Sequence, residues 1–320
     1  MKALVIKLLL LGLPFAAIFF YCEHSLSKVP NSHTKKLAYL NRHDGEIELV
    51  VMGSSQLYDG IDPTCFTLKA FNLANVSQTI YYDTQLLNKF LPQMKSLKVA
   101  ILGLSYFSFE TDLLDSPEEF RCFFYRRFYG IPFPEPNHKP TLDPRNFSLV
   151  ALYRSLHLTY KQSSSDLAPF QTPLGWNRLP GSSAVIDDTT GRETVVRHHK
   201  AMRNRHVASN LAYLEGTLNE LKARQILTVI VTPPVHFTYS DHIDRLRYQF
   251  FLNIVKDICV RNGIVHLDYF FDERFTRDDF YDNDHLNMKG ARKFSALLND
   301  DINRLYPAVA TGPSSPARPK

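Results

Sequence analysis

Cysteine, tryptophan and an excess of charge of one sign are all scarce in this chain. Its 320 residues include four cysteines and one tryptophan, and 37 basic against 32 acidic side chains give a formal net charge of +5. No Cys-x-x-Cys pair occurs, which argues against a disulfide-stapled fold and against a cysteine-based zinc module. The small basic excess argues against a nucleic-acid partner, because proteins that bind nucleic acids cluster Lys and Arg on one surface.

Apolar residues are concentrated at the N-terminus. Residues 3–21 read ALVIKLLLLGLPFAAIFFY and contain a single charge, Lys7. A membrane-spanning helix needs about 20 apolar residues, and a lysine near one end can reach the lipid head groups. We therefore expect residues 1–22 to be a signal anchor, with an N-terminal transmembrane helix that contacts the membrane through residues 3–21. A cleaved signal peptide and a buried core helix are the alternatives.

The same segment predicts where the rest of the chain lies. A short N-terminus normally stays in the cytoplasm, so the remaining residues are expected on the other side of a bacterial inner membrane. The expected localisation is therefore a membrane-anchored protein with an extracytoplasmic, periplasmic domain.

Short apolar runs alternate with amphipathic helical patterns between residues 46 and 305. Continuous apolar strands separated by amphipathic helices are typical of a parallel sheet covered on both faces, so we predict an α/β fold with about five parallel strands. Such sheets place their sites at the carboxyl ends of the strands. The expected strands are 47–52, 69–73, 98–104, 227–232 and 264–269, and the expected helices are 78–94, 204–224, 241–261 and 288–305.

Three segments do not follow this alternation. The polar residues 23–45 are expected to be a linker between the anchor and the domain. Residues from about 110 to 200 are rich in proline, include the aromatic run 120–129, and are expected to form an insertion that covers the site. Residues 306–320 are rich in Ala, Gly, Ser and Pro, which is typical of a disordered tail.

A glycine and two serines follow the first expected strand, as Gly53-Ser54-Ser55. Glycine lets the backbone turn sharply, and a serine at that turn is exposed at the carboxyl edge of the sheet, where the next helix can polarise it. The pattern therefore indicates a nucleophile. A serine-rich turn and a phosphate-binding loop are the alternatives.

An Asp-x-x-His pattern, Asp282 to His285, comes just before the last expected helix. A histidine base needs an acidic partner on one ring nitrogen, so that the other nitrogen can take a proton from a hydroxyl group. An Asp/Asn-rich turn with a capping histidine is one alternative. A metal site made of Asp282, Asp284 and His285 is another, but no second cluster has matching spacing, and we predict no metal and no cofactor. His198 and His199 are expected at the surface.

The two patterns together resemble, in type and order, the conserved blocks of the SGNH/GDSL hydrolase superfamily over residues 46–305. The chain is similar in particular to the membrane-anchored extracytoplasmic branch, which includes the D-alanine transfer proteins of teichoic acid synthesis and the alginate-type O-acetyltransferases. The resemblance implies a three-layer flavodoxin-like fold. It also implies that Ser55 is the nucleophile and that Asp282 and His285 are its catalytic partners.

The blocks that supply oxyanion donors in that family match less well. In the family, a glycine N–H and an asparagine side chain donate together with the N–H of the nucleophile, here Ser55. Ala74 stands near the glycine position and Ser105 stands in the asparagine position, and Asn72 and Asn75 are alternative donors. Losing one donor can cost about 10²–10³ in rate.

These residues predict a serine-dependent acyl transferase or esterase that O-acetylates or deacetylates a cell-surface polysaccharide. Residues 120–129 and Trp176 are candidate lid or glycan-stacking groups, with packing of the insertion as the alternative. The resemblance implies a membrane-bound O-acyltransferase as a possible partner. The weak oxyanion blocks leave open a non-catalytic assembly or binding protein of polysaccharide biosynthesis on the same fold. A cytosolic lipase-like enzyme is a third reading.

Overall fold

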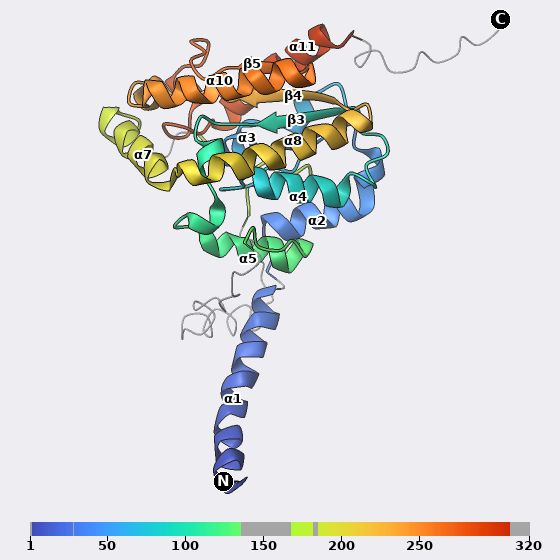
Figure 1. Ribbon diagram of the computed structural model, residues 1–320, viewed down its shortest axis with the longest axis vertical. Coiled ribbons are helices and arrows are strands. Elements are labelled where there is room, and N and C mark those ends of the chain that lie inside the picture. Colours follow the sequence, from blue (N-terminus) through green and yellow to red (C-terminus); the bar gives the residue numbers. More distant parts are fainter. Residues whose placement is uncertain (1, 28, 136–167, 182–184, 308–320) are drawn as a thin grey trace, which may run out of the picture.

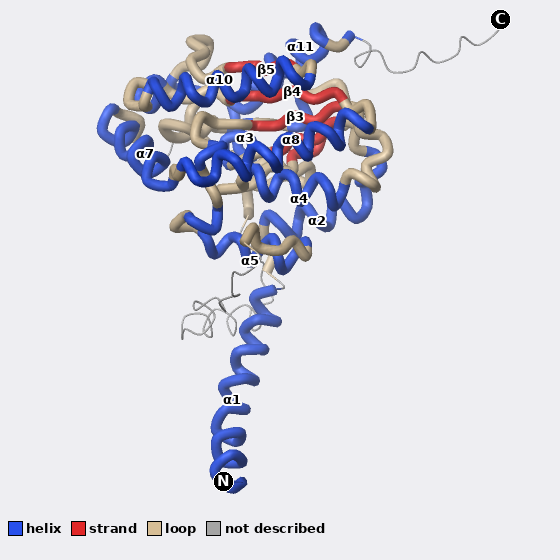
Figure 2. The backbone as a smooth tube through the Cα atoms, in the orientation of Figure 1, coloured by secondary structure: helices blue, strands red, loops and turns tan. Residues whose placement is uncertain are grey.

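A five-stranded parallel sheet lies at the centre of the protein, and helices surround it (Figures 1 and 2). The computed structural model describes residues 2–27, 29–135, 168–181 and 185–307. The strand order is β2-β1-β3-β4-β5, which is the order of doubly wound flavodoxin-like sheets. The strands are β1 (Leu49–Met52), β2 (Ala70–Asn72), β3 (Val99–Gly103), β4 (Leu227–Thr232) and β5 (Val265–Asp268).

The register aligns the carboxyl ends of these strands. Leu49 of β1 lies opposite Ala70 of β2 and Val99 of β3, and Val99 lies opposite Leu227 of β4. The five predicted strands are confirmed, with ends that differ from the prediction by at most two residues. The apolar runs identified them because both faces of a parallel sheet are covered.

The helices of the described residues pack mainly on these two faces. The larger ones are α1 (Lys2–Ser27), α2 (Ser32–His43), α4 (Ile80–Phe90), α7 (Asp188–Ala201), α8 (Val207–Ala223), α10 (Arg245–Asn262) and α11 (Met288–Leu305). Shorter helices are α3 (Ser55–Gly60), α5 (Cys122–Phe124) and α9 (Phe237–Ser240). The helix α11 has the predicted bounds, while α4, α8 and α10 lie within or overlap their predicted ranges.

Alternate residues of each strand serve two separate cores. Val50 and Met52 of β1 belong to a cluster with side chains of α2, α4, α8 and α10. Leu49 and Val51, which point to the opposite face, belong to a second cluster with side chains of α3 and α11. This period of two is the geometry of a strand covered on both sides. The sheet therefore has helices on both faces, as predicted, and its carboxyl edge carries the loops described below.

The segment 23–45, expected as a linker, contains the helix α2. Asn31 caps its N-terminus by accepting from the backbone N–H groups of His33 and Thr34, and the Thr34 side chain completes a capping box. Lys36 and Leu40 are fully buried on its inner side. The short helix has few apolar residues, so its hydrophobic pattern is weak, and tertiary packing decides its place.

The predicted transmembrane helix is wrong. Residues 2–27 do form a helix, which extends away from the domain in Figure 1, but no helix of the described residues combines the length and apolarity needed to cross a membrane. In the sequence, Lys7 and Glu23 bound an uncharged stretch that runs from Leu8 to Cys22, whereas a span takes about 17–25 residues. Leu10 and Phe15 are exposed, which also disagrees with a buried core helix.

The predicted insertion from about 110 to 200 is described only in part. Its described residues include short helical turns such as α5 and the longer helix α7, and aromatic side chains of the run 120–129 pack on the domain, among them Phe123, Tyr125 and Tyr129. Residues 136–167 of this segment and residues 308–320 of the predicted tail lie outside the described residues.

Candidate active site

The turn after β1 places two serines at the carboxyl edge of the sheet. Gly53 has φ of 132°, and a Cβ atom there would lie 3.0 Å from the Gly103 carbonyl oxygen, so the turn needs glycine. The Gly53 N–H donates to Asp83 Oδ1 at 2.9 Å. Ser54 is the N-cap of α3, and Ser55 is the first residue of that helix. The glycine turn and the start of α3 therefore fix the backbone that carries the Ser55 side chain.

The Asp-x-x-His pattern forms a compact turn between β5 and α11. Asp282 Oδ1 accepts from the backbone N–H groups of Asp284 at 3.1 Å and His285 at 2.9 Å. This side-chain-to-backbone bonding is the usual way in which aspartate stabilises a turn. Asn287 then caps α11 by accepting from two backbone N–H groups. The turn is thus folded by residues that are neighbours in sequence.

The two turns meet at His285. Its Nδ1 lies 2.9 Å from Asp282 Oδ1, and its Nε2 lies 2.8 Å from Ser55 Oγ. A carboxylate beside Nδ1 keeps the proton on that nitrogen, so Nε2 presents a lone pair to the serine hydroxyl. The structure thus brings together Ser55 and His285, which lie 230 positions apart in sequence. A base in this arrangement can take the proton of the Ser55 hydroxyl as its oxygen attacks.

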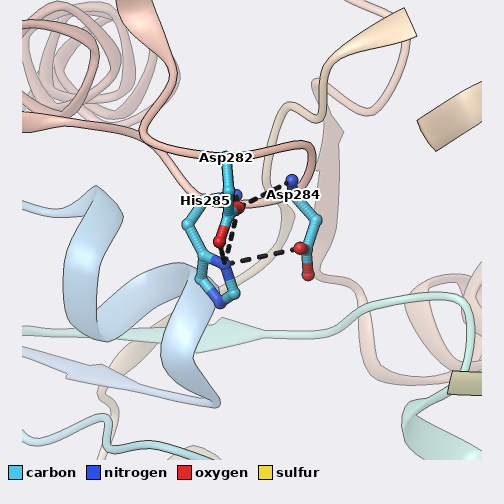
Figure 3. Close-up of side chains that lie close together, drawn as sticks. All are labelled: Asp282, Asp284 and His285. Atoms are coloured by element: carbon cyan, nitrogen blue, oxygen red, sulfur yellow. Dashed lines mark hydrogen bonds and ion pairs between the residues drawn. The ribbon is translucent and has the colours of Figure 1, made fainter. Parts of the chain in front are cut away.

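A second carboxylate, which the sequence suggested only as a metal ligand, faces the same imidazole. Asp284 Oδ1 lies 3.4 Å from His285 Nδ1, and the Asp284 side chain is 2% exposed (Figure 3). Burial alone lowers the pKa of His285, but the charges of Asp284 and Asp282 and their hydrogen bonds outweigh it, so this pKa lies well above 6.5. The two carboxylates therefore favour the imidazolium form, which arises when the serine gives up its proton.

The predicted oxyanion donors are less well placed. The Ala74 N–H, expected to point at the substrate, donates to Val51 O and Asn72 Oδ1, each at 3.1 Å. The N–H of Ser55 is at the first position of α3, where a helix offers no internal acceptor. Of these two backbone donors, only that of Ser55 has no hydrogen-bond acceptor among the described residues.

Asn72 and Asn75, two of the other donor candidates, also donate hydrogen bonds within the protein. Asn72 Nδ2 donates to the carbonyl groups of Leu57 and Ile61, at 2.8 and 3.1 Å. The Asn75 N–H donates to the Gly53 carbonyl at 3.1 Å, and its amide donates to Ser32 Oγ at 3.1 Å. These hydrogen bonds hold the loops together, and none of them involves Ser55.

Ser105 is committed to a residue that the sequence did not single out. Its hydroxyl donates to Gln56 Oε1, and Gln56 Nε2 donates to the Asp284 carbonyl at 3.3 Å. Gln56 is 3% exposed, so it links the loops after β1, β3 and β5 from inside the protein. Its place directly after the two serines was a possible signal, but a polar residue at a helix start is usually exposed.

Comparisons with known proteins add little to this geometry. No family model matches the chain, and no curated protein matches it. Several solved structures match, among them one described as a "putative acylhydrolase" from Bacteroides fragilis. That match has a TM-score of 0.40 and 10% sequence identity, and covers 83% of this chain and 96% of the other. A likeness this low carries no argument about activity.

A buried lysine, also missed in the sequence, lies against the loop after β2. Lys36 of α2 donates to the Ala74 carbonyl, and its Nζ lies 4.4 Å from the centre of the Tyr58 ring. Burial lowers the pKa of Lys36 well below 10.5, against the opposing charges of Asp59 and Asp83. Burial also raises the pKa of Asp59 to about 6 and that of Asp83 to about 7. This cluster supports the loops of the site through the Ala74 carbonyl, which accepts from Lys36, and the Gly53 N–H, which donates to Asp83.

The aromatic candidates for a lid pack into the domain. Trp176 is 2% exposed, and its Nε1 donates to the Asp59 carbonyl at 2.7 Å. Tyr125 is fully buried and stacks on Tyr82 with ring centres 4.0 Å apart. Buried rings cannot stack on a sugar, so Trp176 and Tyr125 follow the packing alternative.

The metal alternative also depends on the turn before α11. Asp282, Asp284 and His285 each offer one donor atom, and these atoms lie within 4.8 Å of one another. A metal on Nδ1 would displace the proton shared with Asp282, and the proton would then sit on Nε2, toward Ser55. Such a histidine could not accept the serine proton. A metal on Nδ1 and a histidine base for Ser55 are therefore mutually exclusive at this turn.

Proposed function

We propose that the protein is a serine-dependent acyl-transfer enzyme, either an esterase or an acyltransferase, with an acyl-Ser55 intermediate. One observation carries this proposal: His285 lies within hydrogen-bond distance of Ser55 Oγ on one side and of Asp282 on the other. A nucleophile, its base and the group that orients the base are the parts that acyl transfer by serine requires.

The reaction proceeds in two steps. Ser55 Oγ forms a bond to the acyl carbon while its proton moves to His285 Nε2, and the imidazolium then protonates the leaving oxygen as the acyl–oxygen bond breaks. In the second step an acceptor hydroxyl attacks the acyl carbon and gives its proton to Nε2, and the imidazolium then returns this proton to Ser55 Oγ as the acyl–Oγ bond breaks. Water as acceptor makes the enzyme an esterase, and a sugar hydroxyl makes it a transferase. The Ser55 N–H supports the oxyanion in both steps.

For the acceptor we propose a cell-surface glycan, with a membrane-bound O-acyltransferase as the supplier of the acyl group and an extracytoplasmic location for the domain. These points are supported by the resemblance to SGNH-type enzymes of cell-surface polysaccharides. Incubation with an activated acetyl ester and oligosaccharides, followed by mass spectrometry of the sugars, tests them. Acetylated product supports transfer, whereas free acetate alone supports hydrolysis.

A fluorophosphonate probe tests the chemistry itself. The serine oxygen of an active enzyme bonds to phosphorus and fluoride leaves, so we expect the wild-type protein to be labelled and Ser55→Ala to remain unlabelled. Ser54→Ala is the matched control, because this neighbouring side chain makes no capping hydrogen bond, and it should be labelled like the wild type. Equal labelling of Ser55→Ala and the wild type would contradict the proposal.

The engagement of Ala74, Asn72, Asn75 and Ser105 in other hydrogen bonds favours a second candidate, a non-catalytic binding protein on the same fold. An enzyme that lacks most of its oxyanion donors is slow. Folded wild-type protein that resists the probe, yet binds an acetylated polysaccharide, would support this second function.

A further inference from the structure

Asp284 is the second carboxylate that faces His285, and one of its oxygens makes no hydrogen bond in the described part of the chain. Asp284 is 3% exposed, and its Oδ1 has no hydrogen-bond partner among the described residues, although it lies 3.4 Å from His285 Nδ1. Figure 3 shows Asp282 and Asp284 approaching this nitrogen from two sides. A carboxylate buried without a partner is costly, so its position points to a function at the imidazole.

A second histidine lies on the far side of Asp284. His198 belongs to α7, and its Nε2 lies 3.7 Å from Asp284 Oδ2. Its Nδ1 lies 2.6 Å from the Tyr239 hydroxyl, and its ring lies 4.6 Å from that of Phe107. The expectation that His198 is a surface residue was wrong, since its side chain is 18% exposed. The Tyr239 hydroxyl also lies 3.4 Å from that of Tyr106, but the shorter contact lets it donate to His198 Nδ1, which leaves the Nε2 proton directed at Asp284.

We propose that Asp284 is a second positioning residue for His285, and that His198 holds Asp284 in place. The proposal rests on the proposed function, because it assigns a role in the proton transfer between Ser55 and His285. Asp282 accepts the Nδ1 proton, and the carboxylate of Asp284 faces the same nitrogen at 3.4 Å from a second direction. This arrangement restricts rotation of the ring and keeps Nε2 aimed at Ser55.

The second carboxylate also stabilises the imidazolium that forms when Ser55 loses its proton. As a consequence, His285 loses its extra proton only at a higher pH than an imidazole with one carboxylate neighbour, because two negative charges stabilise the imidazolium. Burial raises the pKa of Asp284, but the nearby positive charge of His285 outweighs burial and lowers this pKa, so the carboxyl group is ionised. The other charged or titratable groups around the pair are Asp59, Arg197, His198, Tyr106 and Tyr239.

The substitution Asp284→Asn tests the proposal in two ways. An NMR titration of His285 should show a midpoint about one unit lower than in the wild type, which is a tenfold change in proton affinity. The acid limb of the pH profile for probe labelling or ester turnover should move down with it. A merely structural role would lower the folded fraction and leave both midpoints in place. Asp278→Asn, an exposed carboxylate with an 82% exposed side chain, is the matched control and should leave both unchanged.

The variant His198→Gln keeps Asp284 and removes its support, so the midpoint of His285 should move in the same direction by a smaller amount. It also decides the question if Asp284→Asn does not fold. Unchanged His285 titration in the folded variants would overturn the proposal. A wild-type protein that resists the probe, but whose His285 responds to these substitutions, would contradict the enzyme function and leave the paired carboxylates established.

Discussion

The two sides of the Ser55 hydroxyl differ in how completely the site is assembled. On the side of His285, the imidazole contacts the serine and has two carboxylates within 3.4 Å. On the oxyanion side, Ala74 and Ser105 donate to groups of the protein itself. For the proposed reaction, the folded chain thus holds the base and its carboxylates beside Ser55, while among the two backbone donors only the Ser55 N–H is free of an acceptor within the residues that the structure describes.

The difference has a physical origin. The proton-transfer side needs one local turn, Asp282 to His285, and one contact with Ser55. The oxyanion side needs donors from three loops that stay free of acceptors, and a closely packed protein tends to pair every buried polar group. In this chain Gln56 accepts from the Ser105 hydroxyl and Asn72 accepts from the Ala74 N–H, so neither donor is left unpaired. Catalytic hydrogen bonds often tighten only when substrate binds. We therefore expect the arrangement of the oxyanion donors to depend on bound substrate more than the contact between His285 and Ser55 does.

The largest effect is expected from His285→Ala, which removes the base. General acid–base catalysis contributes about 10²–10⁴ in rate, so ester turnover and probe labelling should fall by about that factor while circular dichroism stays unchanged. His43→Ala, at a half-exposed position of α2, is the control and should retain full activity. If His285→Ala turned over within twofold of the wild type, His285 would not be the base, and the two sides of the Ser55 hydroxyl would not differ in the way described.

A smaller effect, on stability, is expected from Lys36→Met beside the loop that carries Ala74. The substitution leaves the Ala74 carbonyl without its buried donor, and an unsatisfied buried group costs about 1–3 kcal/mol. Urea denaturation should show a loss of this size in the free energy of unfolding. The exposed Lys95→Met is the matched control and should stay within about 0.5 kcal/mol. Equal stabilities of the two variants would show that the buried ammonium does not support this loop.

The smallest effect on rate is expected from Ser105→Ala. Because its hydroxyl is bonded to Gln56, we expect turnover to fall by less than about tenfold, compared with about 10²–10³ for a true oxyanion donor. Steady-state kinetics on an activated ester measure the difference. A loss of 10² or more, at unchanged stability, would show that Ser105 turns toward the substrate, and the two sides would then be more alike than the structure indicates.

Much of the fold followed from local patterns. The run LTVIVT predicted β4 with its observed ends, Leu227 and Thr232, and the last helix began and ended where its apolar spacing indicated. Apolar runs and helical periodicity depend on residues that are close in sequence. The same is true of the turn from Asp282 to His285, whose hydrogen bonds join neighbours.

Features that depend on distant partners were missed or misjudged. The helix α2 was expected to be a linker. Two of its buried residues, Lys36 and His33, are polar, so the hydrophobic pattern of the sequence does not identify its inner side. His198 was expected at the surface, although Asp284 and Tyr239 enclose it. The N-terminal transmembrane helix was wrong as well: the apolar stretch predicted a helix correctly, but not a membrane span.

The sequence by itself determined the strands, the main helices, the glycine turn at Gly53 and the Asp-x-x-His turn, since each is stabilised by bonds and packing preferences within a few residues. Only the tertiary structure decided that His285 meets Ser55 across 230 positions, that Asp284 joins Asp282 at the same nitrogen, and that the expected oxyanion donors are bound elsewhere. Burial and hydrogen-bond pairing decide these points, and both depend on which distant side chains the packed sheet brings together.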